Sequence, residues 1–231
     1  MKDIKFEIQS YLEKHPPAQK IFREIIEIGD IYLIGGILRE FRDNGKILQL
    51  RDADIVISIH DRWKWNQMLN TFLTEKNRFN GYKFQCEDFF LDVWELGQTW
   101  AFREKIIQCM PEDYVKMLPY TVFLNVDAIV YDLKNDCWYD ELYENAMRTK
   151  IIDIVLEENP FVLLNILRAM ILKRRYHMQY SNKIKTLICR EFNKNSDIQY
   201  DLNELQIKRY GATILSDNCI QEELKQCLDI E

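Results

Sequence analysis

IYLIGGILREF, at residues 31–41, and DADIVISI, at residues 52–59, are the two segments from which the fold of this chain can be predicted. The first begins with a short apolar run, which predicts a buried strand, and Gly35-Gly36 follows that run directly. Apolar residues then recur at helical spacing, so a helix is expected after the two glycines. The second segment is rich in β-branched residues and predicts another strand.

Outward from these segments, the chain first mixes helical and extended patterns and then becomes helical. A helix is expected over Ala18–Ile28, and further strands are expected over Tyr82–Cys86, Phe89–Glu95 and Val122–Leu133. Beyond about Glu141 only helical patterns occur. This order predicts an α/β or α+β head over residues 1–145, followed by an α-helical domain over residues 146–231.

The composition is that of a soluble globular protein. Of the 231 residues, 47% are hydrophobic and 29% are charged, with a net charge of −6. No apolar run approaches the roughly 20 residues that span a bilayer, and the first residues lack the apolar core of a secretory signal. We therefore expect a cytoplasmic protein with no membrane association. The acidic balance argues against a broad basic face for long nucleic acids.

The Gly35-Gly36 pair is the first candidate binding feature. A strand that ends in two glycines and turns into a helix lets the backbone approach a ligand closely. The free N–H groups and positive dipole end of the following helix suit a phosphate, and Arg39 and Arg42 could donate to the same oxygens. Strand–glycine–helix turns without any ligand are also common, so this signal needs support from elsewhere in the chain.

That support comes from Asp52 and Asp54. Residues i and i+2 of a strand point to the same face, so the two carboxylates lie side by side among Ile and Val. Like charges in such surroundings repel each other, and Mg²⁺, which prefers oxygen ligands, would remove that penalty. The alternative is a strand whose first residues are simply exposed to solvent.

Asp92 adds a third acid. It is the one charged residue within FFLDVW, residues 89–94, and such a residue is seldom fully buried unless it is paired or bound to a metal. If the two strands are neighbours, three carboxylates can hold two metal ions for an in-line displacement. The alternative for Asp92 is the exposed face of an edge strand.

The order of these motifs resembles the polymerase-β-like nucleotidyltransferase superfamily. Its class II branch, the poly(A) polymerase and CCA-adding tRNA nucleotidyltransferase heads, has a strand, then G-G-x-x-R-[DE], then a D-x-D strand. Here the first motif reads GGILRE at residues 35–40, and DAD follows at residues 52–54. NVDAIVYD at residues 125–132 is similar to the family's D-F-T-I-N-A-L-A-Y-D segment, and ILRAM at residues 166–170 is similar to its R-x-x-R-A-x-R-F helix. The resemblance covers roughly residues 20–180.

The resemblance implies a mixed sheet flanked by helices, followed by a helical neck. It also implies a nucleotidyltransferase that moves an NMP from an NTP, ATP or CTP, to a hydroxyl, most directly that of an RNA or tRNA 3′ end, with Mg²⁺ or Mn²⁺ as cofactor. The residues that it assigns are three catalytic acids that bind metal, Asp52, Asp54 and Asp92, and four nucleotide-binding residues, Gly35, Gly36, Arg39 and Arg168.

The sequence also departs from the family pattern. The family's nucleotide-contacting R-R-D aligns with Thr121, Val122 and Phe123, and Asp127 stands where the family has Asn. Metal handling is therefore expected to be retained, whereas nucleotide recognition is expected to differ. A small-molecule or protein hydroxyl is the rival acceptor, and a non-catalytic nucleotide-binding module is the rival class of function.

One compact basic cluster lies outside these motifs. Lys173, Arg174 and Arg175 follow an apolar helix, with His177 and two further lysines nearby. The cluster could contact acceptor phosphates. It could equally be the solvated end of that helix, where cations favour the helix dipole.

Overall fold

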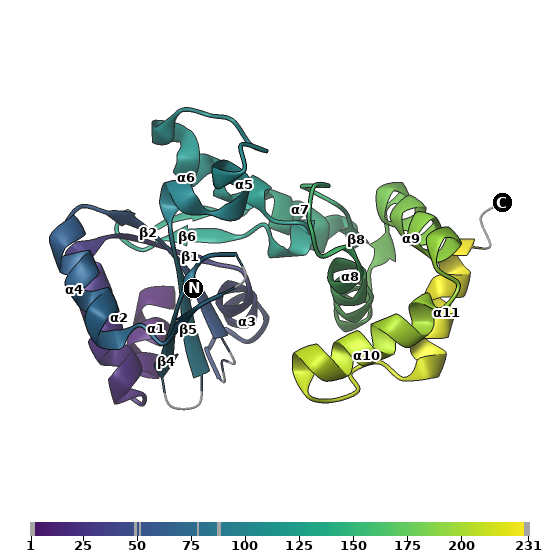
Figure 1. Ribbon diagram of the computed structural model, residues 1–231, viewed down its shortest axis with the longest axis horizontal. Coiled ribbons are helices and arrows are strands. Elements are labelled where there is room, and N and C mark those ends of the chain that lie inside the picture. The colour runs from purple at the N-terminus through teal and green to yellow at the C-terminus, as the bar shows by residue number, and fades with distance from the viewer. Residues whose placement is uncertain (1–2, 49, 51, 78, 87–88, 229–231) are drawn as a thin grey trace. The chain divides into compact units, whose positions relative to one another are not determined.

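The computed structural model of the protein describes residues 3–48, 50, 52–77, 79–86 and 89–228. Within these residues the chain divides into two units. The first consists of the chain up to Thr121 together with Asp127–Glu141, and the second consists of Val122–Val126 together with the chain from Leu142 onward. Each unit is described separately below (Figure 1).

A seven-stranded mixed sheet lies at the centre of the first unit. Its strand order is β3-β4-β5-β2-β1-β6-β7; β2 and β5 run parallel, and every other neighbouring pair is antiparallel. This sheet and its flanking helices confirm the predicted α+β fold class. The strands are β1 (Gly29–Ile34), β2 (Asp52–Ile59), β3 (Glu75–Lys76), β4 (Tyr82–Cys86), β5 (Phe89–Glu95), β6 (Val130–Asp132) and β7 (Cys137–Tyr139).

One face of the sheet packs against the N-terminal helices. Leu33, Ala53 and Leu91, from three adjacent strands, line one small apolar cavity together with side chains of α1, α2 and α3. These strand residues alternate with the acids of β2 and β5, so the acids point to the opposite face. The long helices of this unit are α1 (Ile4–Leu12), α2 (Pro16–Ile28), α3 (Gly36–Asn44) and α4 (Arg62–Phe72).

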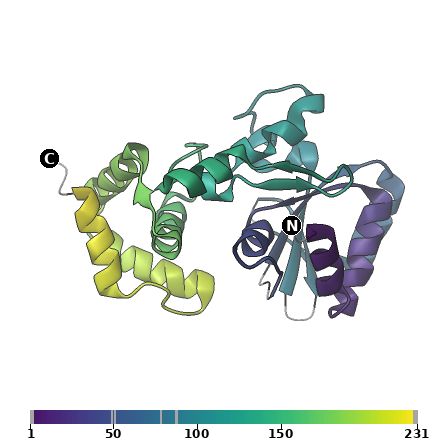
Figure 2. The ribbon, with the colours of Figure 1, turned by 180° about the vertical axis from the view of Figure 1, so that it is seen from behind.

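The opposite face is partly covered by short helices. Tyr32, Val56 and Val130 point to this face and form a small core with Phe102 and Leu118. In Figures 1 and 2, α5 and α6 lie apart from the group formed by α1, α2 and α4. The covering elements are η1 (Leu96–Gln98), α5 (Trp100–Arg103), η2 (Pro111–Asp113), α6 (Tyr114–Met117) and η3 (Leu118–Thr121).

The second unit is built almost entirely from helices around its own core, in which Leu167, Met170, Ile188 and Leu202 are fully buried. Its one pair of strands is only two residues long on each side. The elements are α7 (Glu141–Thr149), β8 (Ile151–Ile152), α8 (Val162–Tyr176), β9 (Gln179–Tyr180), α9 (Asn182–Lys194), α10 (Ile198–Tyr210) and α11 (Asp217–Leu228).

The strand predicted over Val122–Leu133 was wrong in its first half. The backbone of Asn125 bonds to Asp153, and that of Phe123 bonds to Val155, so this segment joins the second unit. The chain then forms the turn η4 (Asn125–Asp127) before β6 begins at Val130. Most residues of both halves are apolar because both halves are buried, but they are buried in different cores.

Among the helices of the described residues, none combines the length and the apolar character needed to cross a bilayer.

Candidate active site

The register of β2 and β5 brings the three predicted acids together. Asp54 lies directly opposite Asp92, and Asp52 precedes Asp54 by two residues on the same face of the sheet. Adjacent strands are about 4.8 Å apart, which makes the carboxylates neighbours. Asp92 is only 8% exposed, and the other two are half-buried. We refer to Asp52, Asp54 and Asp92 as the acid row.

The Gly35-Gly36 turn lies against this row. Gly35 has φ +69°, a conformation that favours glycine, and a Cβ atom built on it would lie 3.5 Å from Oδ2 of Asp54. Gly36 is the first residue of α3, and a Cβ there would lie 3.8 Å from Nη2 of Arg39. The turn therefore places the N-terminus of a nine-residue helix beside a carboxylate of the acid row.

Arg39, the predicted phosphate ligand, is already engaged within the first unit. Its Nη1 donates to Oδ1 of Asp127, and the two side chains are only 12% and 11% exposed. Among the described residues, no hydrogen-bond partner is found for the buried Nε of Arg39. Asp127 stands where the resembling family has Asn. Its carboxylate offsets the positive charge of Arg39, whose guanidinium faces Gly36.

Arg42 was considered as a second phosphate ligand on the same helix. Its Nη2 donates to Asp140, and its guanidinium lies 4.2 Å from the centroid of the Trp138 ring. Both contacts bind the side chain to β7 and to the residue that follows it. This arginine therefore fastens α3 to the edge of the sheet.

Asp92 has two partners that the sequence did not predict. Its Oδ1 accepts a hydrogen bond of 3.2 Å from Nδ2 of Asn77, and Nζ of Lys83 lies 3.9 Å from the same oxygen. Lys83 lies opposite Asp92 in the antiparallel pair of β4 and β5, so it shares the face of the acid row. Only the strand register reveals this lysine, since its spacing in the sequence carries no signal.

The acid row offers oxygen ligands of the kind that bind divalent cations. Carboxylate oxygens are the ligands that Mg²⁺ prefers, and Asp52 and Asp54 offer them from consecutive positions on one strand face. In the part of the chain that the structure describes, however, no group of three or more His, Cys, Asp or Glu is arranged as a metal site. The donors thus fit a site formed by Asp52 and Asp54, with Oδ1 of Asp92 directed to Asn77 and Lys83.

Arg168 and the residues aligned with R-R-D differ in their surroundings from the acid row. Arg168 is half-buried on α8 of the second unit. Phe123 is buried in the core of that unit, and Thr121 bonds through its hydroxyl to the carbonyl of Leu118. Of the three residues aligned with R-R-D, Phe123 therefore packs into a core, and Thr121 is bonded to the backbone.

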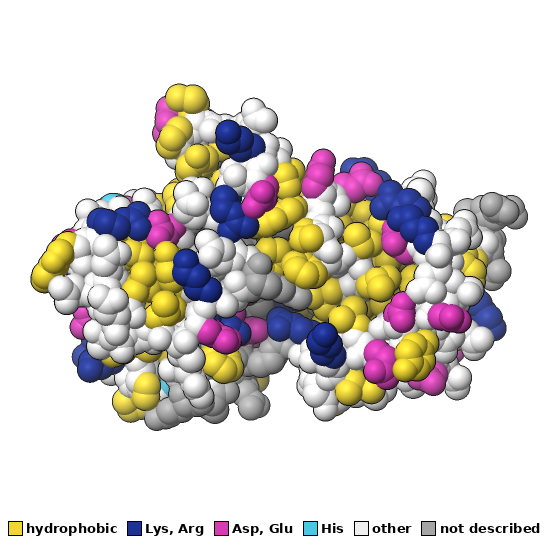
Figure 3. Space-filling model, in the orientation of Figure 1, with side chains coloured by type: hydrophobic (Ala, Val, Ile, Leu, Met, Phe, Trp, Pro, Cys, Tyr) yellow, Lys and Arg dark blue, Asp and Glu magenta, His cyan; other side chains and the backbone are white. Residues whose placement is uncertain are grey.

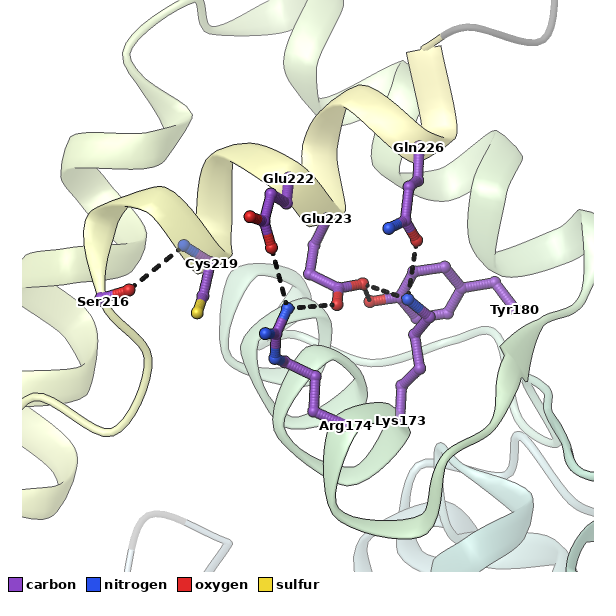
Figure 4. A network of polar contacts seen from close by, with 8 residues as sticks. All are labelled: Lys173, Arg174, Tyr180, Ser216, Cys219, Glu222, Glu223 and Gln226. Carbon is purple, nitrogen blue, oxygen red and sulfur yellow. Dashed lines mark hydrogen bonds and ion pairs between the residues drawn. The ribbon is translucent and has the colours of Figure 1, made fainter.

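The basic cluster of α8 is largely used within the second unit. Nζ of Lys173 donates to Glu223 at 2.7 Å and to Gln226 at 2.8 Å, and Arg174 bonds to Glu223 at 3.2 Å (Figure 4). The Tyr180 hydroxyl donates to the same carboxylate at 2.8 Å. Neither interpretation of the cluster, phosphate contact or a solvated helix end, fits Lys173, which is 8% exposed and bonded to α11.

Charge on the visible surface agrees with the acidic composition. On the face shown in Figure 3, basic and acidic side chains are intermixed over both units, without a continuous basic area. Among the described side chains of this face, positive charge therefore occurs only locally.

Comparison with known proteins identifies the fold. No protein-family model and no curated protein matches the sequence. Among solved structures, the CCA-adding enzyme of Thermotoga maritima complexed with tRNA is 13% identical, with a TM-score of 0.56 over 86% of this chain and 46% of that chain. A tRNA-processing enzyme with CTP is 15% identical, with a TM-score of 0.55 over 87% and 54%. A CCA-adding enzyme in an apo form is 13% identical, with a TM-score of 0.60 over 96% and 54%.

These likenesses establish the architecture. The mixed sheet and the helices that follow it have the fold seen in CCA-adding enzymes, which agrees with the predicted nucleotidyltransferase fold. The chain spans about half the length of each of these structures. At 13–15% identity the comparison shows the fold alone.

Proposed function

We propose that this protein is a metal-dependent nucleotidyltransferase that moves an NMP from ATP or CTP to an acceptor hydroxyl and releases pyrophosphate. The observation that carries the proposal is the position of the acid row beside the Gly35-Gly36 turn at the N-terminus of α3. Carboxylates that bind metal and free helix N–H groups that bind phosphate are the two components that phosphoryl transfer needs.

Each residue has a proposed task within the first unit. Asp52 and Asp54 hold Mg²⁺ or Mn²⁺, and Asp92 completes the row. When bound, the ion supplies the positive charge that activates the acceptor hydroxyl and stabilises the charge on the phosphates. The backbone N–H groups at Gly35 and Gly36 orient the triphosphate. The guanidinium of Arg39, which faces Gly36, adds a charge-assisted contact when the phosphate competes with Asp127.

The proposed division of the chain is a catalytic head over residues 1–145 and a helical neck over residues 146–231. Arg168 belongs to the neck and is proposed to contact the nucleotide. The proposed acceptor is an RNA 3′ end. Two of the similar structures support it by description, one as a complex with tRNA and one as a tRNA-processing enzyme with CTP.

A second acceptor class has its own support. The net charge is −6, and Lys173 and Arg174, from the compact basic cluster, are bound to acids of α11. Phe123 packs into a core where the resembling family binds nucleotide. The charges favour a small-molecule or protein hydroxyl over an acceptor that is held by its phosphate backbone. The change at Phe123 favours the other alternative, a non-catalytic nucleotide-binding module.

The test uses ATP or CTP labelled on the α-phosphate, incubated with Mg²⁺, the protein and separate fractions of cellular RNA, protein and small molecules. We expect one fraction to become labelled, and the labelled fraction identifies the acceptor. The double variant Asp52→Asn with Asp54→Asn should abolish labelling while keeping the circular dichroism spectrum of the wild type. Labelling that persists in this variant would contradict the proposal.

A module without catalysis gives a different result. Such a protein would label no fraction but would still bind the nucleotide in a calorimeter when Mg²⁺ is present. Absence of both labelling and metal-linked nucleotide binding would exclude both forms of the proposed site.

A further inference from the structure

A lysine occupies the same sheet face as the acid row. Lys83 on β4 lies opposite Asp92 on β5, and Asp92 lies opposite Asp54 on β2. Cross-strand partners point to the same face, so the ammonium group and the carboxylates form one line across three strands. The strand register therefore places Lys83 in the same site as Asp92 and Asp54.

The side chain of Lys83 is held in this position by two contacts. Its Nζ lies 3.9 Å from Oδ1 of Asp92 and 4.6 Å from the centroid of the Phe90 ring. The Lys83 side chain is 21% exposed and that of Asp92 is 11% exposed, so water screens the pair only in part. Asn77 donates to the same oxygen of Asp92 from the hairpin between β3 and β4.

We propose that Lys83 is the internal counter-ion of the acid row and that its charge weakens the binding of a divalent cation there. The inference rests on the metal site of the proposed function. A buried carboxylate needs a positive partner, and Lys83 supplies one to Asp92 without any metal. The same positive charge repels a divalent cation at Asp54, one strand away. Lys83 is thus a positioning residue that tunes metal affinity.

The chain contains a matched control lysine. Lys76 on β3 lies opposite Tyr82, the residue before Lys83, and therefore points to the other face of the sheet. Its Nζ lies 4.9 Å from the centroid of the Tyr82 ring and 3.3 Å from Oδ1 of Asn80. Its ammonium group lies over an aromatic ring, as that of Lys83 does, but contacts a neutral amide in place of a carboxylate.

The experiment titrates Mn²⁺ into the full chain and measures the free ion by electron paramagnetic resonance. Lys83→Met keeps an apolar stem over Phe90 and removes the charge, so Mn²⁺ should bind about three- to tenfold more tightly than in the wild type. Lys83→Arg keeps the charge and Lys76→Met removes one from the other face, so both should stay within about twofold of the wild type. Lys83→Gln, which still offers a donor to Asp92, serves if Lys83→Met does not fold.

The outcomes separate this inference from the proposed function. Unchanged or weaker Mn²⁺ binding in folded Lys83→Met or Lys83→Gln overturns the role of Lys83 and leaves the metal site standing. Equal tightening in Lys76→Met also overturns it, because the effect would then reflect net charge alone. If neither the wild type nor any variant binds Mn²⁺, both the proposed metal site and the proposed role of Lys83 are wrong.

Discussion

Charged side chains are buried in both units of this protein, but in two different arrangements. The acid row of the first unit gathers like charges on one sheet face, and Lys83 lies 3.9 Å from it. In the second unit, Lys173 and Arg174 surround Glu223, with contacts of 2.7 and 3.2 Å. The tyrosine and glutamine seen in Figure 4 complete what we term the buried charge cluster, named after the buried ion pair at its centre: Lys173, Arg174, Tyr180, Glu223 and Gln226.

The two arrangements differ in whether each charge has an opposite charge as its partner. In the buried charge cluster, the carboxylate of Glu223 has two positive partners at short distances, so its charge is compensated within the fold and the contacts connect α8 to α11. In the acid row, carboxylates are neighbours of carboxylates, and their repulsion falls when a cation joins them. This contrast supports a role of the cluster in stability and the proposed role of the row in binding a cation.

The largest expected effect comes from breaking the buried charge cluster. Glu223 is 1% exposed, and Glu223→Gln removes the charge that Lys173 and Arg174 share. We expect a loss of about 3–5 kcal/mol in the free energy of unfolding, because a buried ammonium is left without its counter-charge. Urea unfolding followed by circular dichroism measures it.

The neighbouring residue provides the control. Glu222 also contacts Arg174, at 3.4 Å, but its side chain is 61% exposed. Glu222→Gln should change the unfolding free energy by less than about 0.5 kcal/mol. A loss below about 1 kcal/mol in Glu223→Gln would mean that the cluster does not stabilise the second unit.

A smaller effect is expected at the pair of Arg39 and Asp127. Asp127→Asn keeps an acceptor oxygen for Arg39 but removes the charge that offsets the guanidinium. A non-hydrolysable ATP analogue should then bind about tenfold more tightly, which corresponds to about 1.4 kcal/mol. Calorimetric titration at constant Mg²⁺ measures this affinity.

Asp140→Asn is the matched control for that variant. It neutralises the carboxylate paired with Arg42 on the same helix, where the arginine packs on Trp138. It should leave the affinity within about twofold, because Arg42 is held against β7 and its charge, 30% exposed, is partly screened there. Equal effects of the two variants, or weaker binding in Asp127→Asn, would exclude a specific role for Arg39 at the phosphate.

Features that depend on neighbouring residues in the chain could be predicted from the sequence, whereas contacts between distant residues could not. The acids of β2 and β5 and the Gly35-Gly36 turn were predicted from local patterns, and the α+β fold class is confirmed. Strands over Tyr82–Cys86 and Phe89–Glu95 were placed with the bounds found in the structure. Alternating burial and turn residues carry that information locally.

The partners of the charges could not be predicted. Lys83 reaches Asp92 through strand register, Arg39 reaches Asp127 across 88 positions, and Lys173 reaches Glu223 across 50. Each contact follows from tertiary packing, which single-residue patterns do not encode. The basic cluster was ambiguous for the same reason: its acidic partners lie on a helix that comes much later in the chain.

The smallest expected effect is a pH dependence of stability in the second unit. Burial raises the pKa of the Cys227 thiol from its ordinary value of 9.0 to about 11. The unfolded state then releases a proton first, so this stabilisation is present at neutral pH and is lost as the pH rises through 9 to 11. We expect a loss of about 1 kcal/mol from this group between pH 8 and 10.

The comparison of two cysteine variants isolates that contribution. Cys227→Ala should flatten the fall in unfolding free energy between pH 9 and 11, whereas Cys219→Ala, on the same helix, should leave the slope unchanged. Tyr32, whose pKa burial also raises, contributes equally to both proteins. Parallel slopes in the two variants would mean that Cys227 is not the titrating group.

The central claim is that the acid row binds a divalent cation for a nucleotide, whereas the buried charge cluster does not. The most direct measurement is the affinity for a non-hydrolysable NTP with and without Mn²⁺, in the wild type, in Asp52→Asn with Asp54→Asn, and in Glu223→Gln at a temperature where it is folded. Mn²⁺ should strengthen nucleotide binding in the wild type and in Glu223→Gln and have no effect in the double aspartate variant. Metal-linked nucleotide binding that survives in the double variant would contradict the account.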